Sequence, residues 1–147
     1  MCIRDRSVRG VSVRKSPWRI AIESPNYNVM SASKAPARTV LIGSGGMATS
    51  GDYRNYYEVD GERFSHTIDP NTGRPITHKL ASVTVIADTC AEADALATAF
   101  NVLGPELAKT IADKHEIAAF FIVREGDGFK TDFSPAFAAY LDQNSLR

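Results

Sequence analysis

The sequence is poor in cysteine and has no excess of charge of either sign. Cys2 and Cys90 lie far apart without a C-x-x-C spacing, which argues against a zinc site and against a disulfide framework. Lysine plus arginine and aspartate plus glutamate each number 17, so the formal net charge is zero. A general nucleic-acid binder would carry a basic excess or a basic stripe, so we expect no nucleic-acid partner.

The sequence also lacks a long apolar run. The longest runs, "AAFFIV" and "ASVTVIA", fall far below the roughly 20 residues that a membrane helix needs. We therefore expect no transmembrane segment in this chain. With 147 residues, of which 44% are hydrophobic, the chain is predicted to form one domain with a sizeable core.

The N-terminal segment, residues 1–16, is poorly specified and lacks the apolar stretch of a signal peptide. Its charges are mostly basic: Asp5 is the single acid beside Arg4, Arg6, Arg9, Arg14 and Lys15. We expect residues 17–147 to be the downstream part of a longer protein.

Regular structure is predicted from Trp18 onward. Apolar periodicity predicts strands at "WRIAIES", "RTVLI", "ASVTVIA", "AAFFIVR" and "FKTDF", and the turn "DG" between "YRNYYEV" and "ERFSHTI" predicts a hairpin. Helices are expected from about residue 90 to 103, capped by Thr89, and over "PELAKTIADK". The pattern predicts an α+β fold, a mostly antiparallel sheet with helices packed on one face.

The helix expected at 90–103 carries a polar stripe with a single acidic residue. Asp94, Thr98 and Asn101 share this stripe at about 100° per residue. The opposite stripe holds Leu96, Phe100 and Leu103. Because alanines surround Asp94 and no basic residue occurs in this segment, the helix is predicted to be buried nearly all round. A buried carboxylate needs either a hard cation such as Mg²⁺, held with Thr98, or backbone amides, and the pattern leaves both alternatives open.

Two further places could carry chemistry. The stretch "GSGGMATSGDY" matches neither a Walker A loop nor G-x-G-x-x-G, so it favours a turn or bulge over a nucleotide site. His66, in "HTIDPNTG", directly precedes a tight turn. A lone histidine at a strand end is more often structural, yet it is also a candidate general base. His78 and His115 are expected at the surface.

Together these segments resemble one known family. "SGDYRNYY", "HTIDPNTGRPI" and "SVTVIADTCAEADALATA" resemble the hallmark segments of the ApbE family, the FAD:protein FMN transferases. "PWRIAIESP" and "FIVREGDGFKTDFSPAF" resemble the flanking stretches, so the likeness runs from about residue 17 to about residue 141. The resemblance implies a T-fold-like α+β domain.

The resemblance also implies an activity. The enzyme would split the FAD pyrophosphate, transfer FMN to a threonine hydroxyl of an acceptor protein and release AMP. Its cofactor would be Mg²⁺ or another divalent cation. The acceptor is expected to be a protein such as a subunit of a membrane redox complex, and the full-length protein is expected to be a periplasmic or inner-membrane lipoprotein.

Positions of the family motifs assign roles to individual residues. The resemblance makes Asp94 and Thr98 the metal ligands and places His66 at the reacting centre. The flavin nucleotide would contact Thr49, Ser50, Gly51 and His66. The turn after His66 would be shaped by Asp69, Thr72 and Gly73.

Family members are much longer than this chain, and their upstream half supplies much of the flavin pocket and part of the metal site. Two alternatives to an active transferase therefore stay open. In the first alternative the chain is a non-catalytic FAD-binding module, and in the second it is an inactive truncated fragment. The missing half also predicts exposed apolar surface and self-association.

Overall fold

The computed structural model describes residues 5–25, 36–52, 56–59 and 62–142, with the backbone alone at 56–59 and 62–63. A five-stranded sheet forms its centre, in the order β1-β4-β9-β10-β11, and every neighbouring pair is antiparallel. Its strands are β1 (Arg6–Val8), β4 (Gly45–Gly51), β9 (Leu80–Ala87), β10 (Ala118–Glu125) and β11 (Gly128–Phe133). β1 lies within the segment that the sequence leaves poorly specified.

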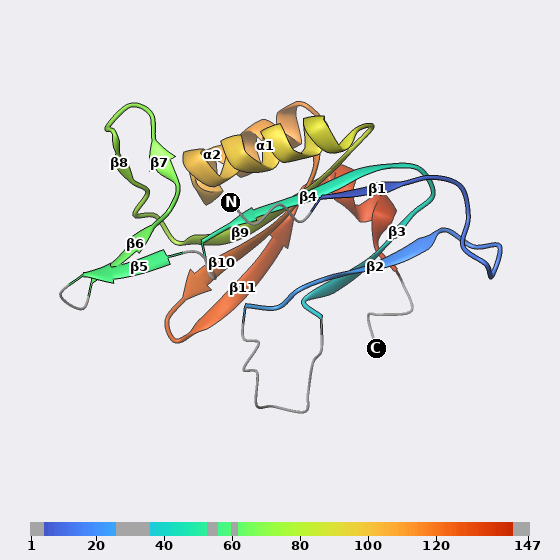
Figure 1. Cartoon of the computed structure of the whole chain (residues 1–147), viewed down its shortest axis with the longest axis horizontal. Helices are drawn as coiled ribbons and strands as arrows, with labels where there is room; N and C mark the ends of the chain where they lie inside the picture. Colours follow the sequence, from blue (N-terminus) through green and yellow to red (C-terminus); the bar gives the residue numbers. More distant parts are fainter. Residues whose placement is uncertain (1–4, 26–35, 53–55, 60–61, 143–147) are drawn as a thin grey trace.

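Three small two-stranded sheets accompany the central one. They pair β2 (Trp18–Ile22) with β3 (Arg38–Ile42), β5 (Tyr56–Val59) with β6 (Glu62–Ser65), and β7 (Ile68–Asp69) with β8 (Arg74–Pro75). In Figure 1 the β2–β3 pair lies under the central sheet, while the β5–β6 and β7–β8 hairpins project past one end of it. The hairpin predicted between "YRNYYEV" and "ERFSHTI" is confirmed, although its turn at 60–61 lies outside the described residues.

Helices α1 (Cys90–Leu103) and α2 (Pro105–Lys114) cover the upper face of the central sheet in Figure 1. The predicted start of α1 is confirmed, because the backbone N–H of Glu92 donates to the Thr89 hydroxyl at 3.2 Å. Gly104 separates the helices with a positive φ of 80°, a conformation that favours glycine. A short 3-10 helix, η1 (Pro135–Tyr140), follows β11.

Each face of the central sheet has its own apolar core. The face under α1 and α2 buries Val83, Val85, Phe100 and Phe121 among many alanines. The opposite face packs against the β2–β3 pair and η1, and buries larger residues: Ile22, Val40, Ile42, Met47, Ile86, Phe120, Ile122 and Phe137. The α+β fold predicted from the sequence, with helices on one face of an antiparallel sheet, is confirmed. Among the described residues, no helix is long and apolar enough to cross a membrane.

Candidate active site

His66 follows the last residue of β6 and is exposed. The turn after it is built around Asp69. One carboxylate oxygen of Asp69 accepts from the Asn71 N–H at 2.9 Å, and the other accepts from the Thr72 hydroxyl at 3.2 Å. Gly73 adopts φ of 66° and donates its N–H to the Asp69 carbonyl at 2.8 Å. The structure thus accounts for Asp69, Thr72 and Gly73 as residues that shape the turn directly after His66.

The polar stripe of α1 borders its buried face rather than lying opposite to it. Asp94 is half-buried, Thr98 is exposed and Asn101 is fully buried. The prediction that Leu103 belongs to the apolar stripe of the helix is wrong, because Leu103 is 40% exposed. The expectation of burial all round is also wrong, because the alanine-rich side of α1 near Ala95 faces outward in this structure. The helix buries one face through close packing on β4 and β9, and Asp94 stands at the edge of that contact.

The segment that carries His66 meets α1 at Asn101. The Asn101 side-chain N–H donates to the hydroxyl of Thr67, the neighbour of His66, at 3.2 Å. His78 donates its Nε2–H to the backbone carbonyl of Asn101 at 2.8 Å, and its Nδ1 accepts from the Leu80 N–H at 3.3 Å. The prediction that His78 is a surface residue is wrong, because its ring is half-buried beneath the end of α1. His115 is exposed, as expected.

The predicted nucleotide segment, Thr49, Ser50 and Gly51, ends strand β4. The Thr49 hydroxyl lies 2.8 Å from the hydroxyl of Thr84 on β9. Because strand residues alternate between faces, Thr49 shares the face of Met47, away from the helices, whereas Ser50 lies on the helix side with Ala48. The structure does not bring the Thr49 side chain together with Asp94 and Thr98.

Gly51 has a structural reason for lacking a side chain. A Cβ atom there would lie 2.7 Å from the Ala81 carbonyl oxygen and 2.7 Å from the Ser82 Cβ. The next residue, Asp52, is buried and pairs with Arg124 of β10, which also donates to the Leu80 carbonyl at 3.4 Å. This ion pair, which no local sequence signal indicates, anchors the end of the predicted nucleotide segment to β10.

The side chain of Asp94 lies close enough to Asp5 for the two carboxyl groups to interact. Burial raises the pKa of Asp5 above its ordinary value, and the nearby charge of Asp94 raises it further. No salt bridge within the described residues includes Asp94. The described part of the chain holds no group of three or more His, Cys, Asp or Glu side chains placed to bind a metal ion. Asp94 and Thr98 can thus supply two oxygen ligands, fewer than the six that Mg²⁺ requires.

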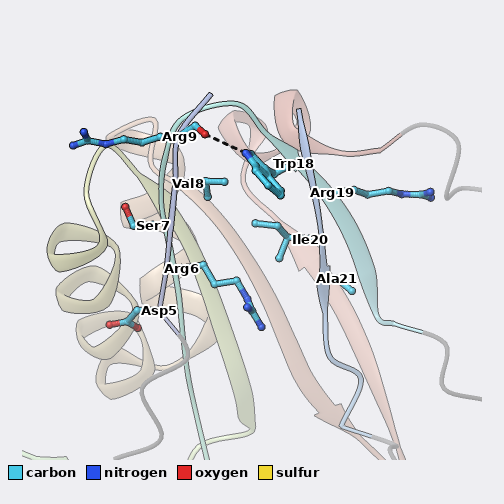
Figure 2. A pocket seen from close by; sticks show the side chains of 9 residues that line it. All are labelled: Asp5, Arg6, Ser7, Val8, Arg9, Trp18, Arg19, Ile20 and Ala21. Atoms are coloured by element: carbon cyan, nitrogen blue, oxygen red, sulfur yellow. Dashed lines mark hydrogen bonds between the residues drawn. The ribbon is translucent and has the colours of Figure 1, made fainter. Parts of the chain in front are cut away.

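A hollow of about 680 Å³ opens between β1 and β2, away from the His66 turn. Figure 2 shows its wall, where the Trp18 indole donates to the Arg9 carbonyl at 3.2 Å. The lining residues are Asp5, Arg6, Ser7, Val8, Arg9, Trp18, Arg19, Ile20 and Ala21. None of the predicted site residues lines this hollow.

Comparison with known proteins supplies the family. The model of the ApbE family matches residues 5–121. The chain belongs to the ApbE family. Similar curated proteins are the FAD:protein FMN transferases of Klebsiella pneumoniae (strain 342) and Escherichia coli (strain K12). Each is 50% identical over 133 residues, which span 90% of this chain and 37% of the relative.

Solved ApbE structures share the fold. The flavinyl transferase ApbE of Pseudomonas stutzeri, in its apo form, superposes with a TM-score of 0.78 at 47% identity, over 93% of this chain and 41% of that one. The flavin transferase ApbE of Vibrio cholerae gives 0.77 at 39% identity, over 93% and 42%. This chain therefore has the ApbE fold over nearly all of its length, and it spans about two fifths of the relatives it matches.

Proposed function

We propose that residues 17–147 form the C-terminal part of an FAD:protein FMN transferase, in which this chain supplies the catalytic histidine and two metal ligands. One observation carries the proposal: in a chain 50% identical to named FAD:protein FMN transferases, the segment bearing His66 is hydrogen-bonded to the helix bearing Asp94 and Thr98. The proposal needs a base and a cation site near one another, and this contact supports that arrangement.

A divalent cation fits the donor atoms of α1. Asp94 and Thr98 are four residues apart, so a carboxylate and a hydroxyl oxygen project from the same side of the helix. The charge of Asp94 has no salt-bridge partner in the described residues, and it raises the pKa of the neighbouring Asp5. These features favour Mg²⁺, which would neutralise charge on the pyrophosphate oxygens of bound FAD. Groups outside this chain would complete the ion's coordination.

His66 would act on the acceptor hydroxyl. A threonine hydroxyl is too weakly acidic to attack phosphorus unaided, so we assign His66 the removal of its proton. The oxygen then forms a bond to the FMN phosphorus, the bond from that phosphorus to the AMP oxygen breaks, and AMP leaves with the electron pair. Thr49, Ser50 and Gly51, which are half-buried at the end of β4, would contact the flavin nucleotide. The acceptor would be a protein with an accessible threonine.

A titration of FAD into the purified chain, with and without Mg²⁺, tests whether this part of the protein forms a usable site. Flavin fluorescence should show saturable binding that needs Mg²⁺, and AMP release should follow when a threonine acceptor is added. Binding without AMP release would favour the alternative of a non-catalytic FAD-binding module. A folded chain that does not bind FAD would instead be an inactive fragment that needs the rest of the protein.

Two substitutions test the residue assignments. Asp94→Ala should abolish the Mg²⁺-dependent signal, whereas the matched control Asp113→Ala, which changes an exposed aspartate of α2, should leave it intact. His66→Ala should slow AMP release by about 10²-fold or more with little change in FAD affinity. His115→Ala is its control. A wild-type rate in His66→Ala would make His66 a structural residue.

A further inference from the structure

Both ends of the segment 66–78 return to the same residue of α1. Near its start, Thr67 accepts a hydrogen bond from the Asn101 side chain at 3.2 Å. At its end, the His78 ring donates to the backbone carbonyl of Asn101 at 2.8 Å. The Asp69 turn and the β7–β8 hairpin lie between these two contacts. One helix residue therefore fixes both ends of the segment that begins with His66.

The His78 contact is matched to the end of the helix. A carbonyl in the last turn of a helix lacks an intrahelical partner, and a histidine ring can supply one. Because the Asn101 carbonyl only accepts, the His78 proton lies on Nε2, which leaves Nδ1 to accept from the Leu80 N–H. Gly104 leaves room for the ring, since a Cβ there would lie 3.1 Å from it.

The Asn101 side chain is costly to bury in this place. It is 0% exposed, and its Oδ1 atom has no hydrogen-bond partner among the described residues. A buried amide that is only partly bonded destabilises a core position, where an apolar residue would stabilise it. We therefore attribute the role of this side chain to the hydrogen bond that its Nδ2–H donates to Thr67.

The position of Asn101 on α1 connects this contact to the proposed site. Asn101 lies three residues after Thr98 and seven after Asp94, so all three project from one side of the helix. Thr67 is adjacent to His66 in the chain. The Asn101–Thr67 hydrogen bond thus ties the neighbour of the proposed base to the helix that carries the proposed metal ligands.

We infer that Asn101 is a positioning residue, which holds the His66 segment on α1 through Thr67 and so sets His66 relative to Asp94 and Thr98. The effect on catalysis rests on the proposed function. The attachment of the segment to α1 rests on the two hydrogen bonds of Asn101.

Substitutions at Thr67 test this without disturbing the fully buried Asn101. Thr67→Val keeps the shape of the side chain and removes the hydroxyl, while Thr67→Ser keeps the hydroxyl. In the Mg²⁺-dependent reaction, Thr67→Val should lower kcat about fivefold or more with an unchanged KM for FAD, and Thr67→Ser should stay within about twofold of wild type. The control is Thr77→Val, which makes the same change at an exposed threonine of the same segment.

The ranking of the two variants separates positioning from packing. If Thr67 only fills space beside the helix, the valine variant should be at least as active as the serine variant. Equal kcat values in wild type, Thr67→Val and Thr67→Ser would overturn the inference while leaving the proposed function in place.

Amide hydrogen exchange gives a readout that does not depend on turnover. The Ile76 N–H donates to the Thr67 carbonyl at 3.0 Å, so its exchange reports whether the segment stays closed on the helix. Thr67→Val should speed Ile76 exchange about fivefold, and neither Thr67→Ser nor Thr77→Val should do so. If the wild-type chain releases no AMP, the proposed function fails for this chain and exchange alone decides. Unchanged Ile76 exchange in Thr67→Val would then overturn the inference.

Discussion

The two faces of the central sheet are packed with different kinds of side chain. Under α1 and α2, six of the eleven buried core residues described are alanine. On the face that meets β2–β3 and η1, two of eleven are alanine and the rest are larger aliphatic or aromatic residues. Large side chains bury more apolar area, whereas alanine lets backbones approach closely. The face with large side chains therefore mainly stabilises the fold, whereas the alanine-rich face mainly sets the position of α1.

Close approach on the helix face is visible at Gly46 of β4. A Cβ atom there would lie 2.3 Å from the Cys90 backbone nitrogen and 2.3 Å from the Thr89 carbonyl carbon. The first turn of α1 therefore rests directly on the strand. Such contact leaves little freedom in the position of the helix, and with it the position of Asp94.

The largest loss of stability is expected on the bulky face. Phe137 is 0% exposed, and its ring stacks on Phe120 with centroids 5.4 Å apart. Phe137→Ala should lower the free energy of unfolding by about 3–5 kcal/mol, because it removes buried area and leaves a cavity. Urea unfolding followed by circular dichroism measures this. Phe137→Leu, which keeps most of the apolar volume, should lose clearly less, and equal losses would contradict a packing role for the ring.

A smaller loss of stability with a larger loss of binding is expected on the helix face. Gly46→Ala forces α1 away from β4 and should cost about 1–3 kcal/mol in the free energy of unfolding. Mg²⁺-dependent FAD affinity, measured by flavin fluorescence, should nevertheless fall more in Gly46→Ala than in Phe137→Leu. The control is Gly43→Ala, where a Cβ would meet nothing within 4 Å. The division between the two faces would break down if Gly46→Ala bound FAD as tightly as Gly43→Ala.

Local signals predicted the elements of both faces. The ends of α1 follow from the Thr89 cap and from Gly104, whose positive φ stops the helix. The run "ASVTVIA" predicted a strand, and the structure has it from Leu80 to Ala87. In each case the signal lies within a few residues of the feature, so one sequence is enough to read it.

Contacts between distant segments were not predictable in the same way. The helical period placed Asn101 on a polar stripe with Asp94 and Thr98, but it gave no sign that the hydroxyl of Thr67, from 34 residues away, would lie beside it. The pair of Asp52 and Arg124 joins residues 72 apart. Neither the period of a helix nor that of a strand encodes which distant side chain arrives beside it. The predicted roles of His66, Asp94 and Thr98 came from a family resemblance and remain predictions.

The N-terminal cap of α1 should contribute an intermediate amount to stability. Thr89→Ala removes the hydroxyl that accepts from the Glu92 N–H, and should lower the free energy of unfolding by about 1 kcal/mol. Thr89→Ser should keep most of it, as measured by urea unfolding. Thr110→Ala is the control, because that exposed hydroxyl bonds only the Glu106 carbonyl within α2. Alanine has the higher helix propensity, so Thr110→Ala should lose little or no stability. A loss in Thr110→Ala as large as that in Thr89→Ala would contradict the capping role of Thr89.

The smallest change in stability is expected on the outer surface of the helices, where side chains neither fill the core nor set the position of α1. Lys109 and Asp113 form an ion pair four residues apart on α2, with side chains 27% and 38% exposed. Lys109→Ala should change the free energy of unfolding by about 0.5 kcal/mol or less, because solvent screens the pair and ordering two long side chains costs entropy. Any difference from wild type should shrink further in 1 M NaCl, where the Debye length is about 3 Å. A loss well above that size that does not depend on salt would mean that the aliphatic part of Lys109 packs on the helices. The helix face would then also contribute to the stability of the fold.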